Sequence, residues 1–434
     1  MRGDGGALVR GRERAAYRDL NVLRWLGAYT ASVTGDVAYY LTLSWAVAQV
    51  AGPATVGVVL AVGAIPRAVL MLGGGVLADR FGPRRVLIAS DLVRCAVVLA
   101  VAVLTYAQGP RLLPLCVLAF VFGVVDAVFM PAVGAVPPRL TGSGQLARVQ
   151  GMRSLAVRLS NAVGPLIAAS VLAARGPGAA FGVVALLFVA SLGLLTAVRV
   201  RPTASPDVPE AAPDAPDVPD NSPGVPEIAP RKGAPGPWAD LRDGLRHLRR
   251  HRRLSRLVLV VALGEMCFSG PLAAGLVLLA DERAWGPTAL GGVLTAFSVG
   301  GAVTGLALTA ARRVPHAGAA LAGSLVVTGI LVTALGQAGT PGAAMALGAV
   351  VGAASGVCGA IGHALVQQRT EPRYLGRVTS VTTLGTLGLS PLLYPVTGLV
   401  AAAWGTGVFF TACGAVCALA AAVGLTSAVR TAEL

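Results

Sequence analysis

Long uncharged stretches alternate with short polar ones along most of this chain. Each stretch has the roughly 20 or more apolar residues with which a helix crosses the hydrocarbon core of a bilayer while satisfying its own backbone hydrogen bonds. The pattern therefore predicts an all-α integral membrane protein with twelve transmembrane helices. The predicted spans lie at about 23–49, 55–78, 86–107, 112–134, 152–174, 178–199, 255–280, 287–310, 317–338, 342–366, 378–402 and 405–427.

The first six spans and the last six echo each other. Segment 56–60 resembles 290–294, and segment 164–166 resembles 390–392, at similar offsets along the chain. Halves that share topology and direction are parallel repeats, so we expect two six-helix bundles. The expected divisions are a tail at 1–21, a bundle at 22–200, a linker at 201–237, an amphipathic helix at 238–253, a bundle at 254–428 and a tail at 429–434.

The two segments between the bundles are polar in different ways. The linker has a proline every three or four residues and no apolar face, which is typical of an extended, disordered segment. The segment 238–253 puts Leu241, Leu245 and Leu248 on one face and six arginines on the others. This pattern favours a helix on the anionic surface of the cytoplasmic leaflet over a solvated charged helix.

The basic residues also predict the orientation. Alternate loops hold nearly all of the arginines, and the remaining loops hold only Arg111, Arg175 and Arg283. By the positive-inside rule, both termini are cytoplasmic, and we expect a multi-pass protein of the bacterial inner membrane. The net charge of +15 does not indicate nucleic-acid binding, because apolar spans separate the arginines. The cysteines lie inside apolar spans without metal-ligand spacing, so no metal is expected.

The loop after the second span carries a compact motif over residues 75–85, Gly-Val-Leu-Ala-Asp-Arg-Phe-Gly-Pro-Arg-Arg. Its glycines permit close helix contact and a tight turn, and its acid can face the positive end of a helix. An ordinary charged turn would explain the two final arginines alone but not the whole spacing. The motif residues are Gly75, Asp79, Arg80, Gly82, Arg84 and Arg85.

This motif resembles the signature loop of the major facilitator superfamily. Further residues are similar to its branch of macrolide-efflux-like drug:proton antiporters: Gly35 and Asp36 with Tyr39 and Trp45, Asp91 with Arg94, Gly164 and Pro165, Gly376 and Arg377, and Pro391. The resemblance covers the chain except the linker, and the loop motif is degraded in the second half. It implies a monomeric transporter in which the loop is a conformational latch. Asp79 would cap a helix that begins near Arg377, and Asp91 and Arg94 would share its charge network.

Ionisable residues inside the spans are the candidates for proton coupling. A charge in hydrocarbon costs roughly 2.5–3.5 kcal/mol, so such residues face a wet cavity or a partner. Asp36, Asp126 and Glu265 are the candidate carriers, and burial of a carboxyl group moves its pKa toward neutrality. Permanently paired acids are the alternative, with Arg67 as a partner for one of them. A pairing of Arg67 with Asp36 places Glu265 first as carrier.

Two weaker candidates complete the site. His363 lies in the tenth span as a proton relay or, alternatively, as a buried histidine with satisfied hydrogen bonds. Aromatic and methionine side chains could line a cavity for a large amphipathic ligand, or could simply pack against other helices and lipid. These are Tyr39, Tyr40, Trp45, Phe122, Phe129, Met266, Phe268 and Tyr394.

The leading functional hypothesis is proton-driven efflux of a small amphipathic molecule such as a drug, an antibiotic or a secondary metabolite. Its partners are the substrate, protons and membrane lipid, without nucleic acid. The chain has no nucleotide-binding loop and no nucleophile–base constellation, so we expect neither cofactor nor enzymatic activity. An importer or facilitator of the same fold and a non-transporting sensor or scaffold remain as alternatives.

Overall fold

The computed structural model describes residues 16–141, 145–198, 237–310, 316–371 and 389–424, with 374, 378, 381 and 382. Side chains are not described at 16, 71–76, 78, 79, 147, 237–241, 244, 267–271, 273, 309 and 389–392. Most of the predicted linker, Arg377 and the side chain of Asp79 therefore lie outside the described parts. Within those parts the chain is helical and contains no strand, which confirms the predicted fold class.

The first bundle follows the predicted spans closely. A short 3-10 turn, η1 (Ala16–Arg18), precedes it. Proline at the first turn of α2, α3 and α5 sets the backbone where no intrahelical amide bond is lost. Its helices are α1 (Leu20–Val50), α2 (Pro53–Phe81), α3 (Pro83–Gln108), α4 (Leu112–Ala135), α5 (Pro137–Leu140) and α6 (Leu146–Thr196).

Two glycines with positive φ shape the connections of this bundle. Gly82, at φ 82°, turns the chain between α2 and α3, as the loop motif predicts. Gly176, at φ 76°, breaks α6, which therefore contains the predicted spans 152–174 and 178–199 as two antiparallel arms. A side chain with a Cβ is strained in this region of backbone space, so glycine suits both positions.

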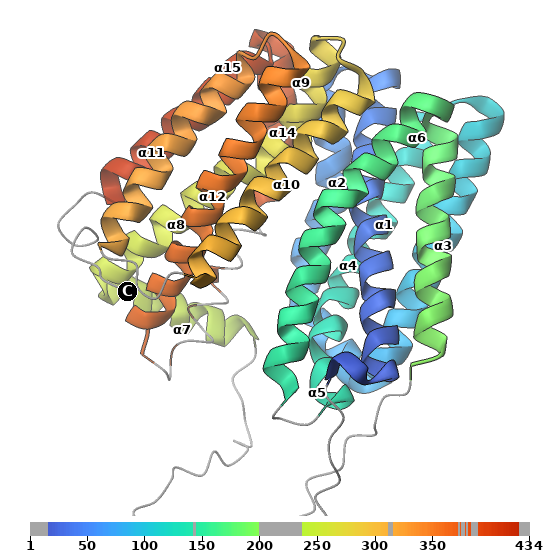
Figure 1. Ribbon diagram of the computed structural model, residues 1–434, viewed down its shortest axis with the longest axis horizontal. Helices are drawn as coiled ribbons and strands as arrows, with labels where there is room; N and C mark the ends of the chain where they lie inside the picture. The colour runs from blue at the N-terminus through green and yellow to red at the C-terminus, as the bar shows by residue number, and fades with distance from the viewer. Residues whose placement is uncertain are drawn as a thin grey trace, which may run out of the picture.

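The second bundle begins with α7, which lies across one end of the molecule (Figure 1). A π-helical turn, η3 (Pro271–Gly275), interrupts the next predicted span. The helices are α7 (Pro237–Arg250), α8 (Arg252–Gly270), α9 (Leu276–Glu282), α10 (Gly286–Ala310), α11 (Ala317–Gly336), α12 (Pro341–Arg369), α14 (Leu389–Trp404) and α15 (Thr406–Gly424).

Eight helices of the described residues are long and apolar enough to cross a membrane. One of them, Arg148–Thr196, has 49 residues and contains the break at Gly176. The chain is therefore a multi-pass integral membrane protein.

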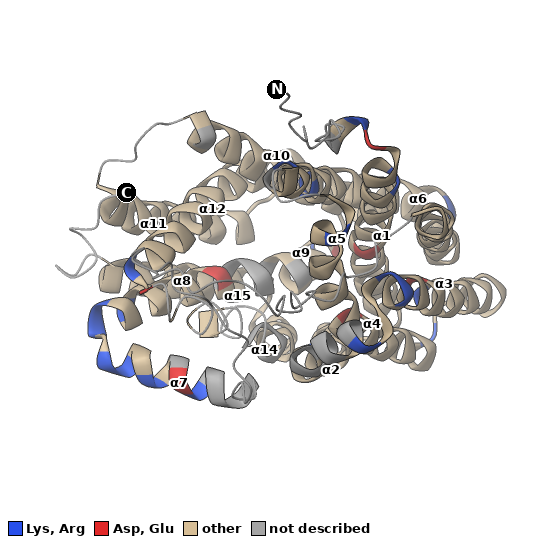
Figure 2. Cartoon of the chain, turned by 90° about the horizontal axis from the view of Figure 1, so that it is seen from below, with Lys and Arg blue, Asp and Glu red and all other residues tan. Residues whose placement is uncertain are grey.

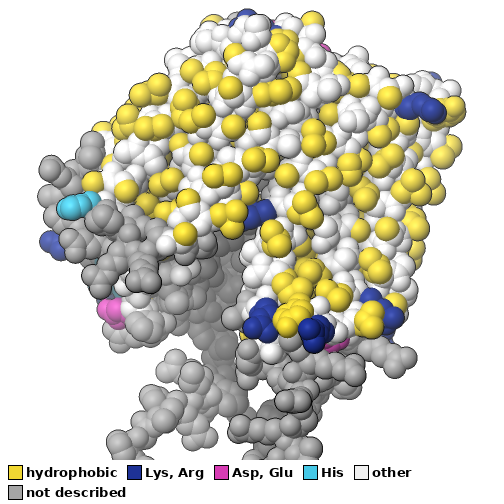
Figure 3. Space-filling view, in the orientation of Figure 1, with side chains coloured by type: hydrophobic (Ala, Val, Ile, Leu, Met, Phe, Trp, Pro, Cys, Tyr) yellow, Lys and Arg dark blue, Asp and Glu magenta, His cyan; other side chains and the backbone are white. Residues whose placement is uncertain are grey.

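The two ends of the molecule differ in charge. We call the end that carries Arg24, Arg80, Arg139 and α7 the basic end, and the opposite end the far end. Dark blue side chains gather at the basic end of the first bundle in Figure 3, and arginines line α7 in Figure 2.

The described parts of the two bundles meet at the far end and diverge toward the basic end (Figures 1 and 3). One core cluster runs through both bundles toward the far end, from Ala38 to Phe410. Toward the basic end each bundle has a separate core, around Trp25 in the first and Leu257 in the second. The structure is therefore closed at the far end.

Candidate functional site

A cluster of charged side chains lies inside the first bundle, around Arg94 of α3. The Arg94 side chain is fully buried, and its Nη1 lies 2.9 and 3.1 Å from the two carboxylate oxygens of Asp36 on α1. Its Nη2 lies 3.1 Å from Asp126 Oδ1 on α4, an ion pair without the alignment of a hydrogen bond. Asp91, one turn earlier on α3, lies 3.8 Å away. One guanidinium thus contacts three carboxylates.

Aromatic rings complete the surroundings of Arg94. The centre of its guanidinium lies 4.0 Å from the ring centroid of Phe129 and 5.6 Å from that of Phe188. Guanidinium groups are weakly hydrated and are attracted to the faces of aromatic rings, which favours arginine over lysine at this position.

Arg67 of α2 joins the cluster from the other side of Asp126. Its Nη1 lies 3.8 Å from Asp126 Oδ2 and donates to the hydroxyl oxygen of Tyr40 at 3.4 Å. The Tyr40 hydroxyl in turn donates to Asp126 Oδ2 at 3.3 Å. Asp126 is therefore held by two guanidiniums and one hydroxyl, whereas Asp36 contacts only Arg94 among the described side chains.

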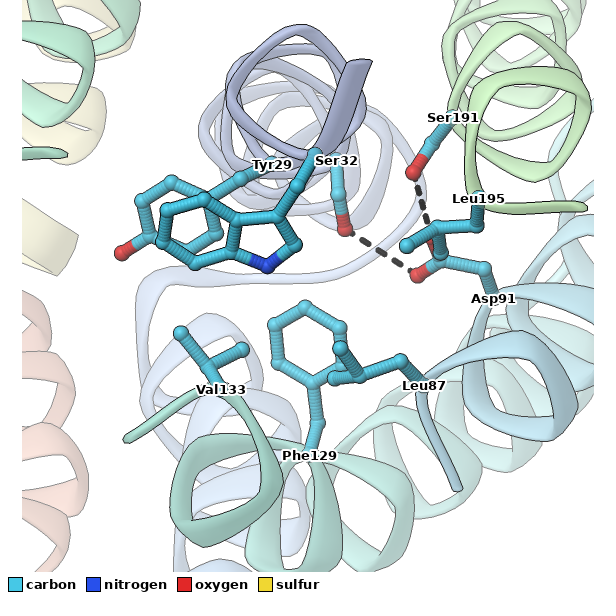
Figure 4. A pocket seen from close by; sticks show the side chains of 9 residues that line it. Tyr29, Ser32, Leu87, Asp91, Phe129, Val133, Ser191 and Leu195 are labelled. Carbon is cyan, nitrogen blue, oxygen red and sulfur yellow. Dashed lines mark hydrogen bonds between the residues drawn. The ribbon is translucent and has the colours of Figure 1, made fainter. Parts of the chain in front are cut away.

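Two serines, which sequence reasoning missed, hold Asp91. Ser32 of α1 donates to Asp91 Oδ1 at 3.0 Å and Ser191 of α6 donates to Oδ2 at 2.6 Å (Figure 4). Asp91 is completely buried, so these bonds replace the water that an exposed carboxylate would bind. Serines are common in membrane helices, and nothing in their spacing indicated this role.

The cluster contains three carboxylates and two guanidiniums. With every group ionised, one negative charge has no counterpart among the described side chains. An unmatched charge inside a membrane protein is costly, so the cluster can take up one further positive charge. A proton is the smallest such charge. The described residues hold no group of His, Cys, Asp or Glu that could bind a metal ion.

The observed pairing corrects one sequence-based interpretation. Arg67 was expected to be available to Asp36, but Asp36 pairs with Arg94 and Arg67 pairs with Asp126. The reason is the rotation of α3, which turns Arg94 into the bundle toward α1 and α4. Asp91 and Arg94 were expected in the charge network of the loop, and the described contacts place them in this cluster.

Glu265 lies apart from the cluster, in the second bundle. It is half-buried on α8 and faces α12, where a Cβ added at Gly359 would be 3.4 Å from its Oε1. His363, one turn beyond Gly359, is exposed and has its Nδ1 2.9 Å from the Gly359 carbonyl oxygen. Among the described side chains, none forms an ion pair with Glu265.

Most of the candidate aromatic residues pack inside the first bundle. Tyr39, Trp45, Phe122 and Phe129 are all buried, and Tyr39 stacks on Phe122 with 3.7 Å between centroids. In this state these four side chains contribute to packing. Three other candidates are less enclosed, because Tyr40 is exposed and Met266 and Tyr394 are half-buried; the side chain of Phe268 is not described.

The loop motif is anchored to the last arm of α6. Arg84 Nη2 donates to the carbonyl oxygen of Thr196 at 2.7 Å, while Arg80 and Arg85 are exposed. Gly75 lies within α2, and the latch contact between Asp79 and the region of Arg377 remains a prediction.

Comparisons with known proteins agree with this architecture. The family profile described as Major Facilitator Superfamily matches residues 25–384. No curated protein sequence matches the chain. The fold is similar to that of the nucleoside transporter NupG, with 13% identity, a TM-score of 0.67, and coverage of 94% of this chain and 99% of that one. It is also similar to an auto-inhibited POT family peptide transporter, with 15% identity, a TM-score of 0.66, and coverage of 96% and 98%.

Proposed function

This chain belongs to the Major Facilitator Superfamily and is a membrane transporter, and on that basis we propose that it exports a small amphipathic compound in exchange for protons. The observation that carries this proposal is the charge cluster of the first bundle. Three carboxylates share two guanidiniums inside the bundle. One bound proton makes this cluster neutral, and its release leaves one uncompensated negative charge, so the cluster can alternate between a protonated and an ionised form.

Within the cluster, we assign the exchangeable proton to Asp36. Asp91 accepts two serine hydroxyls, and Asp126 contacts two guanidiniums, so both are stabilised as carboxylates. Asp36 has a single guanidinium, which it shares, and its side chain is 20% exposed against 9% for Asp126. It is thus the most accessible and least compensated of the three. Glu265 is the second candidate.

Alternating access is supported by the way the bundles pack. Their cores merge toward the far end and separate toward the basic end. The distribution of arginines supports a cytoplasmic basic end with both termini, in a bacterial inner membrane with twelve spans. In that orientation the structure is the inward-facing state, and export requires a second state that is closed at the basic end.

An importer or facilitator of the same fold is the competing function. The similar structures include a nucleoside transporter and peptide transporters, and a POT family transporter in complex with 5-aminolevulinic acid. Their identities of 13–15% support the fold and leave the substrate of this chain open. The macrolide-efflux-like resemblance and the charge cluster favour proton-coupled export of a drug or antibiotic.

The test is growth of cells with and without this gene on a panel of toxic amphipathic compounds, with and without a protonophore. Export predicts resistance to at least one compound and loss of that resistance when the proton gradient collapses. Resistance that survives the protonophore contradicts proton coupling. Greater sensitivity in cells that carry the gene contradicts export and favours import.

A further inference from the structure

A small cavity lies beside Asp91, between the charge cluster and the basic end. It lies among α1, α3, α4 and α6 and offers about 10 Å³ to the centre of a water-sized sphere. Ser32, Asp91 and Ser191 line one side, and apolar side chains such as Phe129 and Val133 line the other (Figure 4). A space of this size holds about one water molecule.

One polar atom of the lining has no protein partner. The indole of Trp25 also lines the cavity, its residue is 1% exposed, and its Nε1 has no hydrogen-bond acceptor among the described residues. An indole nitrogen can only donate, and a buried donor without an acceptor is costly. The Trp25 Nε1 donor is therefore stabilised if a hydrogen-bond acceptor occupies the cavity.

Asp91 supplies the complementary group. Its carboxylate has about four lone-pair directions, and the hydroxyls of Ser32 and Ser191 use one on each oxygen. A water molecule in the cavity can accept from Trp25 Nε1 and donate to Asp91. It would have the two or more polar partners that a buried water requires, with apolar walls elsewhere.

We propose that this cavity binds one water molecule between Trp25 and Asp91, and that this water is the point at which protons reach the charge cluster from the basic end. The second clause rests on the proposed proton coupling. Trp25 is five residues into α1 from its start at Leu20, which is about 8 Å along the helix. The proton route then runs inside the first bundle, apart from the space between the bundles.

The charged groups around Asp91 are consistent with proton movement from the basic end toward Asp36. Arg94 lies on the same helix, Asp36 faces it from α1, and Asp126 from α4, while α6 presents the uncharged Ser191. A proton that arrives at Asp91 is next to the guanidinium that Asp36 also contacts. Transfer is complete when Asp91 releases this proton and a carboxylate oxygen of Asp36 accepts it, which returns Asp91 to its ionised form beside Arg94.

The first test is a density map of the full-length protein at a resolution that shows ordered water. The expected result is one water within hydrogen-bond distance of both Trp25 Nε1 and a carboxylate oxygen of Asp91. A cavity without density, or a water that contacts neither atom, overturns the proposal.

The second test is a pH jump on the purified protein in lipid nanodiscs, with infrared detection of carboxyl protonation and protons as the only probe. Val133→Leu adds one methylene at the cavity wall, and Trp25→Phe removes the donor. We expect each to slow protonation roughly fivefold, the rate equivalent of one lost hydrogen bond. The matched control is Val98→Leu, which adds the same group in the core of the same bundle away from the cavity.

The outcomes separate this proposal from the proposed function. Wild-type protonation rates in both variants, with the water present in the map, overturn the route and leave the coupling claim intact. Equal slowing in Val98→Leu assigns the effect to general packing and also overturns the route. A wild-type protein whose carboxyl groups do not titrate at all contradicts proton coupling itself.

Discussion

At the scale of single residues, Arg94 is the side chain on which the site most depends. It is the shared partner of Asp36, Asp91 and Asp126, and it lies among aromatic rings where water cannot replace it. Removal of one member of a buried ion pair leaves the other members uncompensated. The cluster is therefore expected to contribute to stability as well as to coupling.

We expect Arg94→Ala to destabilise the protein by about 3–5 kcal/mol, the usual effect of breaking a buried ion pair. The measurement is thermal unfolding of the purified variant in detergent. Arg111→Ala, an exposed arginine at the far end, is the control and should change stability by no more than about 0.5 kcal/mol. An Arg94→Ala protein that melts with the wild type would contradict the buried ion-pair network.

The sequence revealed which residues of the site are ionisable but not how they pair. Asp36, Asp126, Arg67 and Arg94 stand out because charges are rare in apolar spans. Their pairing depends on the rotation of α1, α3 and α4 about their axes, which apolar residues on every face leave undetermined. The change of partner for Asp36 is also why we place it before Glu265, the reverse of the ranking from sequence.

At the scale of elements, the contact between α6 and α10 joins the two bundles. Pro165 has no amide proton, so the carbonyl oxygen of Asn161, four residues earlier, has no donor in its own helix. Ser298 of α10 donates to it at 2.9 Å, and Thr295 donates to the carbonyl oxygen of Ala162 at 2.8 Å. Pro165 thus leaves the Asn161 carbonyl oxygen available as an acceptor, and a hydroxyl of the second bundle donates to it.

Loss of both hydroxyls should weaken this contact. We expect Thr295→Val with Ser298→Ala to lose about 1 kcal/mol for each hydrogen bond and to shift the balance between the two facing states. Distances between spin labels on the two bundles at the basic end measure that balance. Ser324→Ala is the control, because the Ser324 hydroxyl bonds only within the second bundle among the described residues, to the Leu321 carbonyl oxygen of α11 and to Cys358 of α12. Unchanged distance distributions in the double variant would contradict this role.

The helix α7 is attached to the second bundle by one face. Leu248 and His247 are buried, and the His247 ring stacks on Tyr374 with 4.0 Å between centroids. Arg246, Arg249 and Arg250 are exposed. This arrangement supports the proposal that α7 lies on the cytoplasmic leaflet and binds anionic lipid.

A basic residue near an anionic membrane surface is worth about 1 kcal/mol. We therefore expect anionic lipid to stabilise the wild type in nanodiscs relative to neutral lipid, and Arg249→Gln with Arg250→Gln to reduce that difference. Arg111→Gln, at the far end, should leave it unchanged. Equal stabilisation of the double variant and the wild type by anionic lipid would contradict lipid binding by α7.

At the scale of the whole molecule, the hydropathy pattern was sufficient for the all-helical fold and for the positions of several described helices. The predicted spans agree with α3 and α4 to within about three residues at either end, because apolar length in a bilayer is set by its thickness. The break of α8 at η3 was not predicted, since Pro271 lies within an otherwise apolar stretch. The state of the transporter also could not be predicted, because hydropathy indicates which segments are apolar and not how the two bundles pack against each other.

The orientation makes a prediction for the whole chain. The linker near Pro219 should be cytoplasmic, because the loops on that side hold most of the arginines. A reporter enzyme that is active only outside the cytoplasm, fused at this position, should give no signal, whereas the same reporter near Arg283 should be active. A strong signal from the linker fusion would overturn the proposed topology.

The central claim is that Asp36 carries the coupled proton. Asp36→Asn leaves two carboxylates and two guanidiniums, so we expect a folded protein that still exchanges substrate for substrate across liposome membranes. It should no longer release protons when substrate moves, whereas Glu265→Gln should retain proton movement. The measurement is substrate-driven proton movement in liposomes, with the compound that the growth panel identifies. Wild-type proton movement by Asp36→Asn, or its loss in Glu265→Gln alone, would contradict the claim.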